Sequence, residues 1–281
     1  MSQSPNPESP DPPRLEVLAD LLTQVAMGDL SVAAALDQIE TNGDQQAPID
    51  SPTPLTLDLD RQRRCGFPEV VYGQGKPPEL IRKIIDQQQQ AEQPSLVTRI
   101  DPATAAHLET AFEHAQFNRV ARTLSVGVNQ RVERLRCDAS EAQPHAAVIS
   151  AGSTDAPVAE EAIETLAWMG IPIQIFHDIG VAGPQRLLDA VPQLRRASAV
   201  VVVAGMEGAL PAAVGGHLDT PVFAVPTSVG YGATLGGLTP MLGMLSSCAS
   251  NVAVVNIDAG FKAGYLAGLV AHQSRPRDAL S

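Results

Sequence analysis

The chain has 281 residues, a hydrophobic fraction of 44% and a formal net charge of −12, which suits one large or two small globular domains. The acidic balance argues against broad nucleic-acid binding, which needs basic faces, but backbone N–H groups can still hold an anionic ligand. No apolar run reaches the ~18–20 residues of a membrane span, and the N-terminus lacks a signal-peptide pattern, so we expect a cytoplasmic protein. The three cysteines show no C-x-x-C spacing, which argues against a disulfide framework or structural zinc.

The first part of the chain is predicted to lie outside the main fold. Residues 1–13 are polar and proline-rich and are predicted to form a disordered tail. Between Arg14 and Glu40, apolar side chains recur at helical spacing with one interruption, which predicts two short helices suited to packing on another subunit. Residues 41–56 have a linker composition, so we assign a helical arm and linker to residues 14–56.

A small α/β domain is predicted over residues 57–143, where strand and helix patterns follow one another closely. The predicted strands are Leu57–Asp60, Glu69–Tyr72, Leu96–Ile100 and Thr123–Val126. The predicted helices are Pro77–Gln90 and Pro102–His114. This order describes a compact domain of about 90 residues, a size within the usual range.

Residues 144–281 show a stricter alternation of strands and helices. The predicted strands are His145–Ser150, Ile171–His177, Ala199–Ala204, Pro221–Pro226 and Val252–Ile257. The predicted helices are Ala156–Met169, Gln185–Leu194, Leu210–Leu218, Leu238–Leu245 and Phe261–His272. Unbroken valine and isoleucine strands between helices indicate an α/β fold with a parallel, doubly wound, Rossmann-like sheet covered on both faces. Ligands of such sheets bind beyond the carboxyl ends of the strands.

Each predicted strand end in this second domain carries glycine together with hydroxyl, carboxyl or amide groups. In chain order, the candidate substrate-binding residues at these ends are Ser150, Gly152, Ser153, Thr154 and Asp155; His177 and Asp178; Gly205 and Met206; Thr227, Ser228, Gly230, Tyr231 and Gly232; and Asn256 and Asp258. One such loop is weak evidence. Five that converge on one edge of a parallel sheet predict a site for a polar ligand, most simply a nucleotide.

Several of these residues also have plain structural interpretations. Asp155 could simply cap the following helix, and Asp178 could be a cap or an acceptor for a ribose hydroxyl. His177 could be an interior histidine whose hydrogen bonds are satisfied. Glu207, in a glycine-rich stretch after a buried strand, could face a ligand or a metal. The loop over residues 226–234 is long and lined with hydroxyls, as expected of a mobile cover over a ligand.

Five strings carry a resemblance to the LarB family, and together they cover most of residues 57–270. They are RCGFPEVV from Arg64, SAGSTDAPVAEE from Ser150, GMEGALP from Gly205, PTSVGYGATLGG from Pro226 and SCASNVAVVNIDAG from Ser247. The second domain is also similar, more distantly, to the PurE class of aminoimidazole ribonucleotide carboxylases. That similarity implies a PurE-like, Rossmann-like sheet and a homo-oligomer, either an octamer or a smaller dimer-based assembly.

The LarB resemblance implies carboxylation at C5 of the pyridinium ring of nicotinic acid adenine dinucleotide, with CO2 or bicarbonate as co-substrate, and release of AMP. The product would be pyridinium-3,5-biscarboxylic acid mononucleotide, a precursor of the nickel-pincer cofactor. Nickel itself is added by later enzymes and is not expected here. One departure argues against a purine substrate, because PurE enzymes carry a histidine where this chain has Ala209, just before Leu210 and Pro211.

Cys248 is the predicted nucleophile. A pyridinium ring attacks CO2 only after gaining electron density, and a thiolate can both add to the ring and leave it. Cys248 lies among serines in the second domain, at the position of the LarB nucleophile, whereas Cys65 and Cys137 are expected to be small buried residues. His217 and Lys262 are candidate neighbours that could activate the thiol.

Glu207 is predicted to remove the C5 proton or to contact a divalent ion, and the sequence does not separate these roles. Mg²⁺ bound with the substrate phosphates is expected to assist cleavage of the phosphoanhydride by neutralising charge. His217 is expected to hydrogen-bond a substrate carboxylate or phosphate. A group of basic residues in the first domain could hold phosphate or form a solvated face; these are Arg61, Arg63, Arg64 and Lys76.

Two other functions remain open from the sequence. One is a purine-type carboxylase that acts on an aminoimidazole ribonucleotide and needs no cysteine. The other is a nucleotide-binding regulator without catalysis, which would bind a dinucleotide without turning it over and would carry an unreactive Cys248.

Overall fold

Residues 23–25, 27–32, 34–35, 57–128, 132–137 and 143–275 are described by the structure, a computed structural model of the chain. Contacts divide the chain into two units, Met1–Thr56 and Leu57–Ser281. The predicted tail and most of the predicted helical arm lie outside the described residues. Within the described ranges, no helix is both long and apolar enough to cross a membrane.

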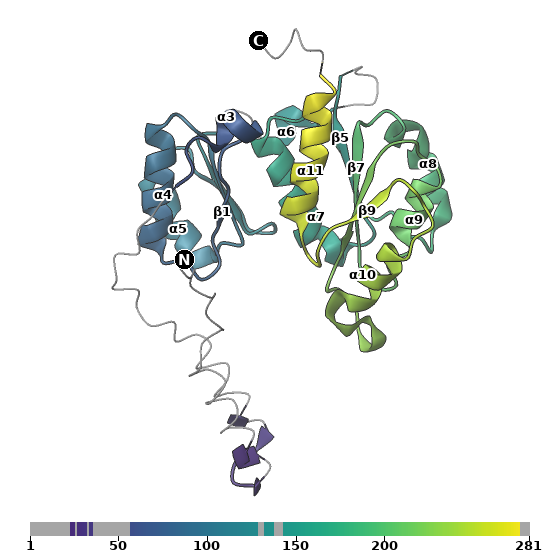
Figure 1. The fold of residues 1–281 in the computed structure, drawn as a ribbon, viewed down its shortest axis with the longest axis horizontal. Helices are drawn as coiled ribbons and strands as arrows, with labels where there is room; N and C mark the ends of the chain where they lie inside the picture. The colour runs from purple at the N-terminus through teal and green to yellow at the C-terminus, as the bar shows by residue number, and fades with distance from the viewer. Residues whose placement is uncertain are drawn as a thin grey trace, which may run out of the picture. The chain divides into compact units, whose positions relative to one another are not determined.

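The second unit begins with a four-stranded mixed sheet (Figure 1). Its strands are β1 (Val71–Tyr72), β2 (Ser95–Thr98), β3 (Gln116–Asn118) and β4 (Thr123–Val126). Their order in the sheet is β1-β2-β4-β3, with β1 parallel to β2 and β4 antiparallel to both of its neighbours. The helices of this part are α3 (Arg61–Cys65), α4 (Pro78–Gln90), α5 (Pro102–Ala111) and α6 (Val132–Leu135).

Helices α4 and α5 follow directly from their sequences. Helix α4 starts with a proline, which suits the first turn, and buries Ile81, Ile84 and Ile85 at helical spacing. Helix α5 is capped by Asp101, whose carboxylate accepts a hydrogen bond from the backbone N–H of Thr104 at 2.9 Å. The predicted helices in this region are therefore confirmed.

One prediction for this region is wrong, and one strand was missed. Leu57–Asp60 is not a strand; it is irregular and leads into α3. It is held by side chains, because Gln93 donates to the carbonyl of Leu59 at 2.8 Å. Strand β3, with the sequence QFN, was not predicted. It lies at the edge of the sheet and is only partly buried, so it lacks a strong apolar pattern.

The rest of the unit is a five-stranded, fully parallel sheet, which confirms the predicted Rossmann-like α/β fold. The strands are β5 (Ala146–Ser150), β6 (Ile173–Phe176), β7 (Ala199–Ala204), β8 (Val222–Pro226) and β9 (Val252–Val254). The helices are α7 (Ala156–Trp168), α8 (Pro184–Leu194), α9 (Leu210–Gly215), α10 (Leu238–Leu245) and α11 (Gly260–Gln273), with 3-10 turns η1 (Ser153–Asp155) and η2 (Gly232–Gly237). The strand order is β6-β5-β7-β8-β9.

Two hydrophobic clusters lie on the two faces of this parallel sheet. Val201 and Val203 of β7 pack with α7 and α11, whereas Val200 and Val202 pack with α8, α9 and α10. All six residues of β7 are buried. Burial on both faces explains why this strand reads as an unbroken apolar run and not as an alternating one.

Phe67 joins the two halves of the unit. Its ring lies 6.0 Å from that of Trp168 on α7, and 5.9 and 5.4 Å from the rings of Tyr265 and His272 on α11, measured between centroids. The indole N–H of Trp168 also donates to the carbonyl of Pro94 at 3.1 Å. Aromatic contacts of this kind add to the burial of large apolar surfaces. The two sheets therefore share part of one core.

Small residues bring α11 against α7. A Cβ atom on Gly264 would lie 2.7 Å from the carbonyl oxygen of Ala162, whereas one on Gly216, at the end of α9, would meet nothing closer than 3.6 Å. We expect Gly264→Ala to lower the free energy of unfolding by about 1–3 kcal/mol, because the added methyl overpacks the helix contact. Gly216→Ala is the matched control and should be near neutral in urea denaturation. Equal stability of the two variants would contradict this account.

Candidate functional site

The loop after β5 contributes a buried serine and a short 3-10 turn. Ser150 is buried, and its Oγ lies 3.2 Å from Nδ1 of His177, which follows β6. Because β5 and β6 are neighbouring parallel strands, their carboxyl ends lie side by side. Ser153 and Thr154 are exposed in η1, just before α7. His177 is itself exposed, so its interpretation as an interior histidine is wrong.

Asp155 links the loops that follow β5 and β8. Its Oδ1 accepts a hydrogen bond from Oγ1 of Thr227 at 2.7 Å, and its Oδ2 accepts one from the backbone N–H of Gly152 at 3.0 Å. Asp155 is 4% exposed and Thr227 is fully buried. The carboxylate makes no capping bond to the first turn of α7. Asp155 therefore caps the turn η1 through Gly152 and also joins it to the loop after β8, and it does not cap α7.

Burial raises the pKa of Asp155 above its ordinary value of 3.8. Hydrogen bonds from Thr227, Gly152 and Gly205 oppose that effect, and the negative charge of Asp258 adds to it. The Asp155 carboxyl is therefore easier to protonate in the folded protein than in the unfolded chain.

The loop after β7 is fitted closely to the loop after β8. The N–H of Met206 donates to the carbonyl of Val229 at 3.2 Å, and a Cβ atom on Gly205 would lie 2.6 Å from Oγ1 of Thr227. Any side chain at position 205 would therefore displace the hydroxyl that binds Asp155. Glycine is needed here for close approach of two backbones.

Four strand-end loops contain a non-glycine residue with positive φ. These are Asp178 after β6 (φ 57°), Met206 after β7 (φ 54°), Leu235 after β8 (φ 47°) and Asp258 after β9 (φ 55°). Such backbone conformations are strained for residues with a Cβ and persist only where surrounding contacts hold them. Four of the eight such residues in the described part of the chain lie at this edge of the sheet, so its turns depend on contacts between the loops.

Asp258 connects the last strand to the loop after β8. Its Oδ1 accepts a hydrogen bond from the N–H of Ser228 at 2.8 Å, and its own N–H donates to the carbonyl of Pro226 at 2.8 Å. Asn256 serves its own turn, since its Oδ1 accepts from the N–H of Ile257 at 2.9 Å. The loops after β5, β7, β8 and β9 are therefore connected by hydrogen bonds or direct backbone contact.

Other predicted site residues lie apart from this network. Asp178 is exposed and bound by Arg186, whose Nη1 lies 2.6 Å from its carboxylate. His217 is exposed in the connection between α9 and β8, where its carbonyl accepts from Arg195 at 3.1 Å. Tyr231 is 80% exposed, between Gly230 and Gly232. None of these three side chains contacts Asp155 among the interactions of the described residues.

Cys248 is exposed in the loop between α10 and β9. The body of α10 touches the loop after β7, because a Cβ on Gly243 would lie 2.8 Å from the carbonyl oxygen of Glu207. Gly243, which contacts the backbone of Glu207, therefore lies five residues before Cys248. Among the described residues, the Cys248 thiol and the Glu207 carboxylate have no hydrogen-bond or ion-pair partner, and neither His217 nor Lys262 pairs with the thiol.

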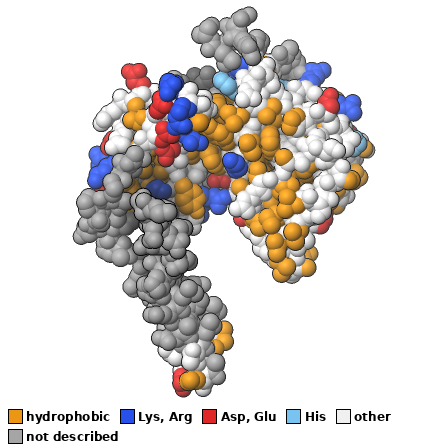
Figure 2. Space-filling view, in the orientation of Figure 1, with side chains coloured by type: hydrophobic (Ala, Val, Ile, Leu, Met, Phe, Trp, Pro, Cys, Tyr) orange, Lys and Arg blue, Asp and Glu red, His pale blue; other side chains and the backbone are white. Residues whose placement is uncertain are grey.

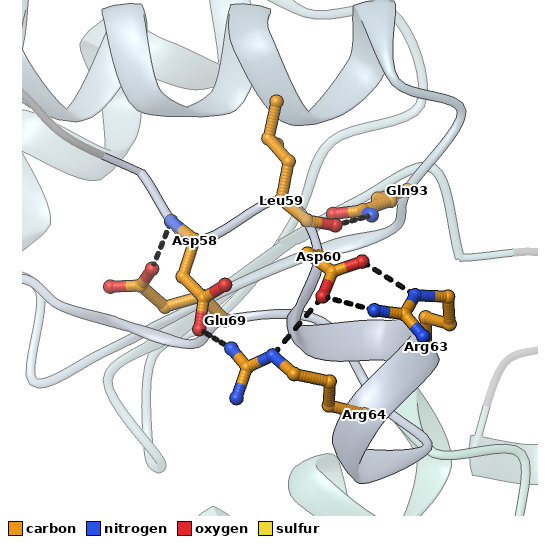
Figure 3. Close-up of polar contacts among 7 residues, drawn as sticks. All are labelled: Asp58, Leu59, Asp60, Arg63, Arg64, Glu69 and Gln93. Atoms are coloured by element: carbon orange, nitrogen blue, oxygen red, sulfur yellow. Dashed lines mark hydrogen bonds and ion pairs between the residues drawn. The ribbon is translucent and has the colours of Figure 1, made fainter.

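Three of the four basic residues considered for phosphate binding, Arg63, Arg64 and Lys76, have local partners, and Arg61 is partly buried in α3. Arg63 lies 2.7 and 2.9 Å from the two carboxylate oxygens of Asp60, and Arg64 binds both Asp58 and Asp60 (Figure 3). Lys76 donates to the carbonyl of Tyr72 at 2.8 Å. Exposed ion pairs of this type contribute little stability, but they occupy the guanidinium groups. This arrangement favours the interpretation of a solvated surface over a phosphate grip.

Cys65 also differs from expectation. It lies at the end of α3 and is exposed, so the prediction of a small buried residue is wrong. Cys137 is partly buried. A cavity of about 390 Å³ does exist in the unit, but it lies between β3, β4 and α7, lined in part by Asn118, Glu160 and Glu164. It is not part of the strand-end cluster.

Comparison with known proteins places this arrangement in a family. Residues 53–129 match the LarB/PurE-like N-terminal domain, and residues 145–278 match the AIR carboxylase domain. The chain is 37% identical over 262 residues to an uncharacterized protein of Methanocaldococcus jannaschii, covering 90% of this chain and 96% of that protein. The chain belongs to the LarB family.

Membership of the LarB family, with a PurE-like C-terminal domain, supports a carboxylase-type enzyme in nickel-pincer cofactor biosynthesis. The strand-end edge is where a nucleotide would bind in such a fold. Within the described residues, no group of three or more histidine, cysteine, aspartate or glutamate side chains could hold a metal ion.

Two residues that the sequence did not single out bear on this LarB site. Arg99, directly after β2, forms an ion pair at 3.0 Å with Glu161 of α7 and also donates to the carbonyl of Asp258. Glu161 lies on a face of α7 that also buries Ala162 and Thr165. A carboxylate on a buried helix face requires a partner. The position of Glu161 on the apolar face of the predicted helix was therefore the signal available in the sequence.

The raised pKa of Asp155 predicts how the stability of this LarB protein depends on pH. The native state favours the protonated Asp155 carboxyl, and protonation therefore stabilises the fold. This contribution to the free energy of unfolding is complete below pH 3.8, the pKa of Asp155 in the unfolded chain, and is lost as pH rises through its native pKa. Asp155→Asn cannot titrate there. As pH rises, the free energy of unfolding of wild type should therefore fall relative to that of Asp155→Asn.

The fall should be about 1.4 kcal/mol for each unit that separates the native and unfolded pKa values of Asp155. Urea denaturation of both proteins between about pH 4 and pH 7 measures the difference. A difference that instead grew in favour of wild type with rising pH would show that Asp155 is ionised more easily in the native state.

Proposed function

We propose that this chain carboxylates C5 of the pyridinium ring of nicotinic acid adenine dinucleotide and hydrolyses its phosphoanhydride. The products are AMP and pyridinium-3,5-biscarboxylic acid mononucleotide. The observation that carries the proposal is the hydrogen-bonded set of strand-end loops, centred on the Asp155–Thr227 contact, in a chain of the LarB family. Such an edge offers backbone N–H groups and hydroxyls to phosphate and ribose.

In the proposed carboxylation, the thiolate of Cys248 adds to C4 of the ring and gives a neutral dihydropyridine. The enamine carbon C5 then attacks CO2, which forms the new C–C bond and leaves an iminium at the ring nitrogen. Removal of the C5 proton returns electrons to the ring, and departure of the thiolate from C4 restores the pyridinium. The exposed position of Cys248 is consistent with a thiol that must reach a ligand.

Glu207 is proposed to take the C5 proton. It is exposed in the loop after β7, and its backbone lies against Gly243 of the helix that leads to Cys248. A carboxylate without a protein partner among the described residues can accept a proton from a bound ligand. The same helix therefore relates the positions of the proposed base and the proposed nucleophile.

The remaining roles concern binding. The start of α7 with Ser153 and Thr154 is proposed to hold phosphate, and the loop after β8 is proposed to close over the nucleotide. Mg²⁺ is proposed to enter with the substrate phosphates, where it would neutralise charge on the phosphoanhydride. Asp155 and Asp258 already accept hydrogen bonds from the protein, so we assign neither carboxylate to an ion.

The first test is incubation of the full chain with nicotinic acid adenine dinucleotide, bicarbonate and Mg²⁺, with products identified by mass spectrometry. We expect AMP and a mononucleotide heavier by one CO2, and we expect Cys248→Ala to lose carboxylation by roughly 10³-fold or more because the nucleophile is absent. Cys65→Ala, at another exposed thiol, is the matched control and should retain activity.

Two outcomes of this test would redirect the assignment. If wild type leaves the dinucleotide untouched, the proposed substrate fails, and aminoimidazole ribonucleotides would be tested next. If Cys248→Ala carboxylates as well as wild type, the covalent mechanism fails even though the substrate is correct.

We also propose that the chain works as a homo-oligomer. Hydrophobic side chains gather on the surface over η2 and α10 (Figure 2). The exposed members are Tyr231, Leu235, Leu238, Leu242 and Leu245. An apolar surface of this kind next to a ligand edge is typical of a buried contact with another chain, and we assign it to a second copy.

This assembly predicts the effect of a charge on that surface. Leu242 is 53% exposed, so Leu242→Glu should leave the fold intact while disrupting a self-contact through α10. Sedimentation should then show a smaller species than wild type. Leu188→Glu, at a 45% exposed leucine on α8, is the matched control and should not change the size. A wild-type monomer, or an unchanged Leu242→Glu assembly, would contradict the proposal.

A further inference from the structure

Arg99 connects the N-terminal sheet to the turn between β9 and α11. Its Nε donates to Oε1 of Glu161 at 3.0 Å, and its Nη2 donates to the carbonyl oxygen of Asp258. The Glu161 side chain is 4% exposed, and its Oε2 accepts from the N–H of Phe261 at 3.1 Å. One guanidinium and one buried carboxylate therefore hold together the end of β2, helix α7 and the start of α11.

Asp258 extends this constraint to the loop after β8. Besides its contact with Arg99, it binds the carbonyl of Pro226 through its N–H and the N–H of Ser228 through its carboxylate, both at 2.8 Å. The residue before Ser228 is Thr227, which donates to Asp155. A continuous series of contacts thus runs from Arg99, outside the parallel sheet, to the centre of the strand-end cluster.

Both ends of the Arg99–Asp258 contact have unusual backbones. Each residue has φ of 55°, a left-handed conformation that residues with a Cβ adopt only when neighbouring contacts maintain it. Burial acts to lower the pKa of Arg99, but the charges of Glu161 and Asp258 raise it above its ordinary value. The guanidinium therefore stays charged, and the contact that it makes is specific to its planar, multidentate geometry.

We propose that Arg99 is a positioning residue that holds residues 256–260 and, through Asp258, the Thr227–Ser228 segment in the geometry that binds the nucleotide. The N-terminal sheet thereby acts on a site built from the C-terminal sheet without touching the reacting atoms. For the identity of the ligand, this inference rests on the proposed function. The positioning itself is a property of the free protein.

Hydrogen exchange on the ligand-free full chain tests the positioning directly. Arg99→Gln removes the charge and leaves the Asp258 turn less constrained, so the amides of Ser228, Asp258 and Phe261 should exchange about tenfold faster or more. Arg82→Gln is the matched control, because Arg82 is an exposed arginine on α4 whose closest ion pair, with Asp86, spans 4.0 Å. It should leave those three amides unchanged.

A double variant separates positioning from general stability. Arg99→Gln alone leaves Glu161 buried without its cation, which should lower the Tm. Adding Glu161→Gln removes the buried charge, so the Tm should recover toward wild type. The fast exchange at Ser228 should persist, and calorimetry should still show affinity for nicotinic acid adenine dinucleotide reduced by about tenfold, because the contact to Asp258 is still missing. Arg99→Lys keeps the charge without the planar group, so its exchange rate at Ser228 and its affinity should lie between those of wild type and Arg99→Gln.

The outcomes decide the inference separately from the proposed function. Unchanged exchange at Ser228 and Asp258 in Arg99→Gln would overturn it, as would full recovery of both exchange and affinity in the double variant. If wild type binds no nicotinic acid adenine dinucleotide, the proposed function fails, and the exchange measurement alone still decides whether Arg99 positions these loops.

Discussion

The hydrogen bond between Thr227 and Asp155 is the contact on which the candidate site depends. It joins two residues 72 positions apart, each buried, at the carboxyl ends of β5 and β8. A buried hydroxyl and carboxylate are costly without partners, so each keeps the other in place. The parallel sheet makes the contact geometrically available, because all five strand ends meet at one edge.

The rest of the edge is arranged around that contact by close backbone approach. Gly205 leaves space for the Thr227 hydroxyl. Gly237 leaves space for the Thr227 carbonyl oxygen, which would lie 2.9 Å from a Cβ at position 237. Strained residues such as Met206 and Asp258 complete the turns. Small residues and strained turns cost stability, and at this edge they occur where a ligand would need close access to backbone groups.

The N-terminal sheet supports the C-terminal sheet through one apolar contact and one ion pair. Phe67 packs with aromatic side chains on α7 and α11, and the ion pair between Arg99 and Glu161 reaches the turn at Asp258. The apolar contact secures the two halves, whereas the ion pair orients a specific turn. The PurE-like sheet of this chain is therefore supported from outside by a domain with no catalytic residue assigned to it.

The sequence by itself determined the parallel α/β fold and nearly every element of the C-terminal sheet, because buried strands and amphipathic helices have strong local patterns. It also predicted a ligand site at the strand ends and named Asp155, Thr227 and Asp258 among their residues. Only the tertiary structure showed that these three are linked, since hydrogen bonds between distant loops leave no local pattern. The same limit explains why the partners of Arg99 were missed.

The local sequence pattern also predicted the wrong structure where side-chain hydrogen bonds set the backbone conformation. Leu57–Asp60 resembles a short strand, yet polar contacts from Gln93 and Glu69 hold it in an irregular form. The nearby arginines could have met phosphate or carboxylate, and the structure shows Arg63 and Arg64 paired with aspartates. Residue type fixed which chemistry was available to each side chain, and folding decided which partner it met, because that depends on distances between segments far apart in the chain.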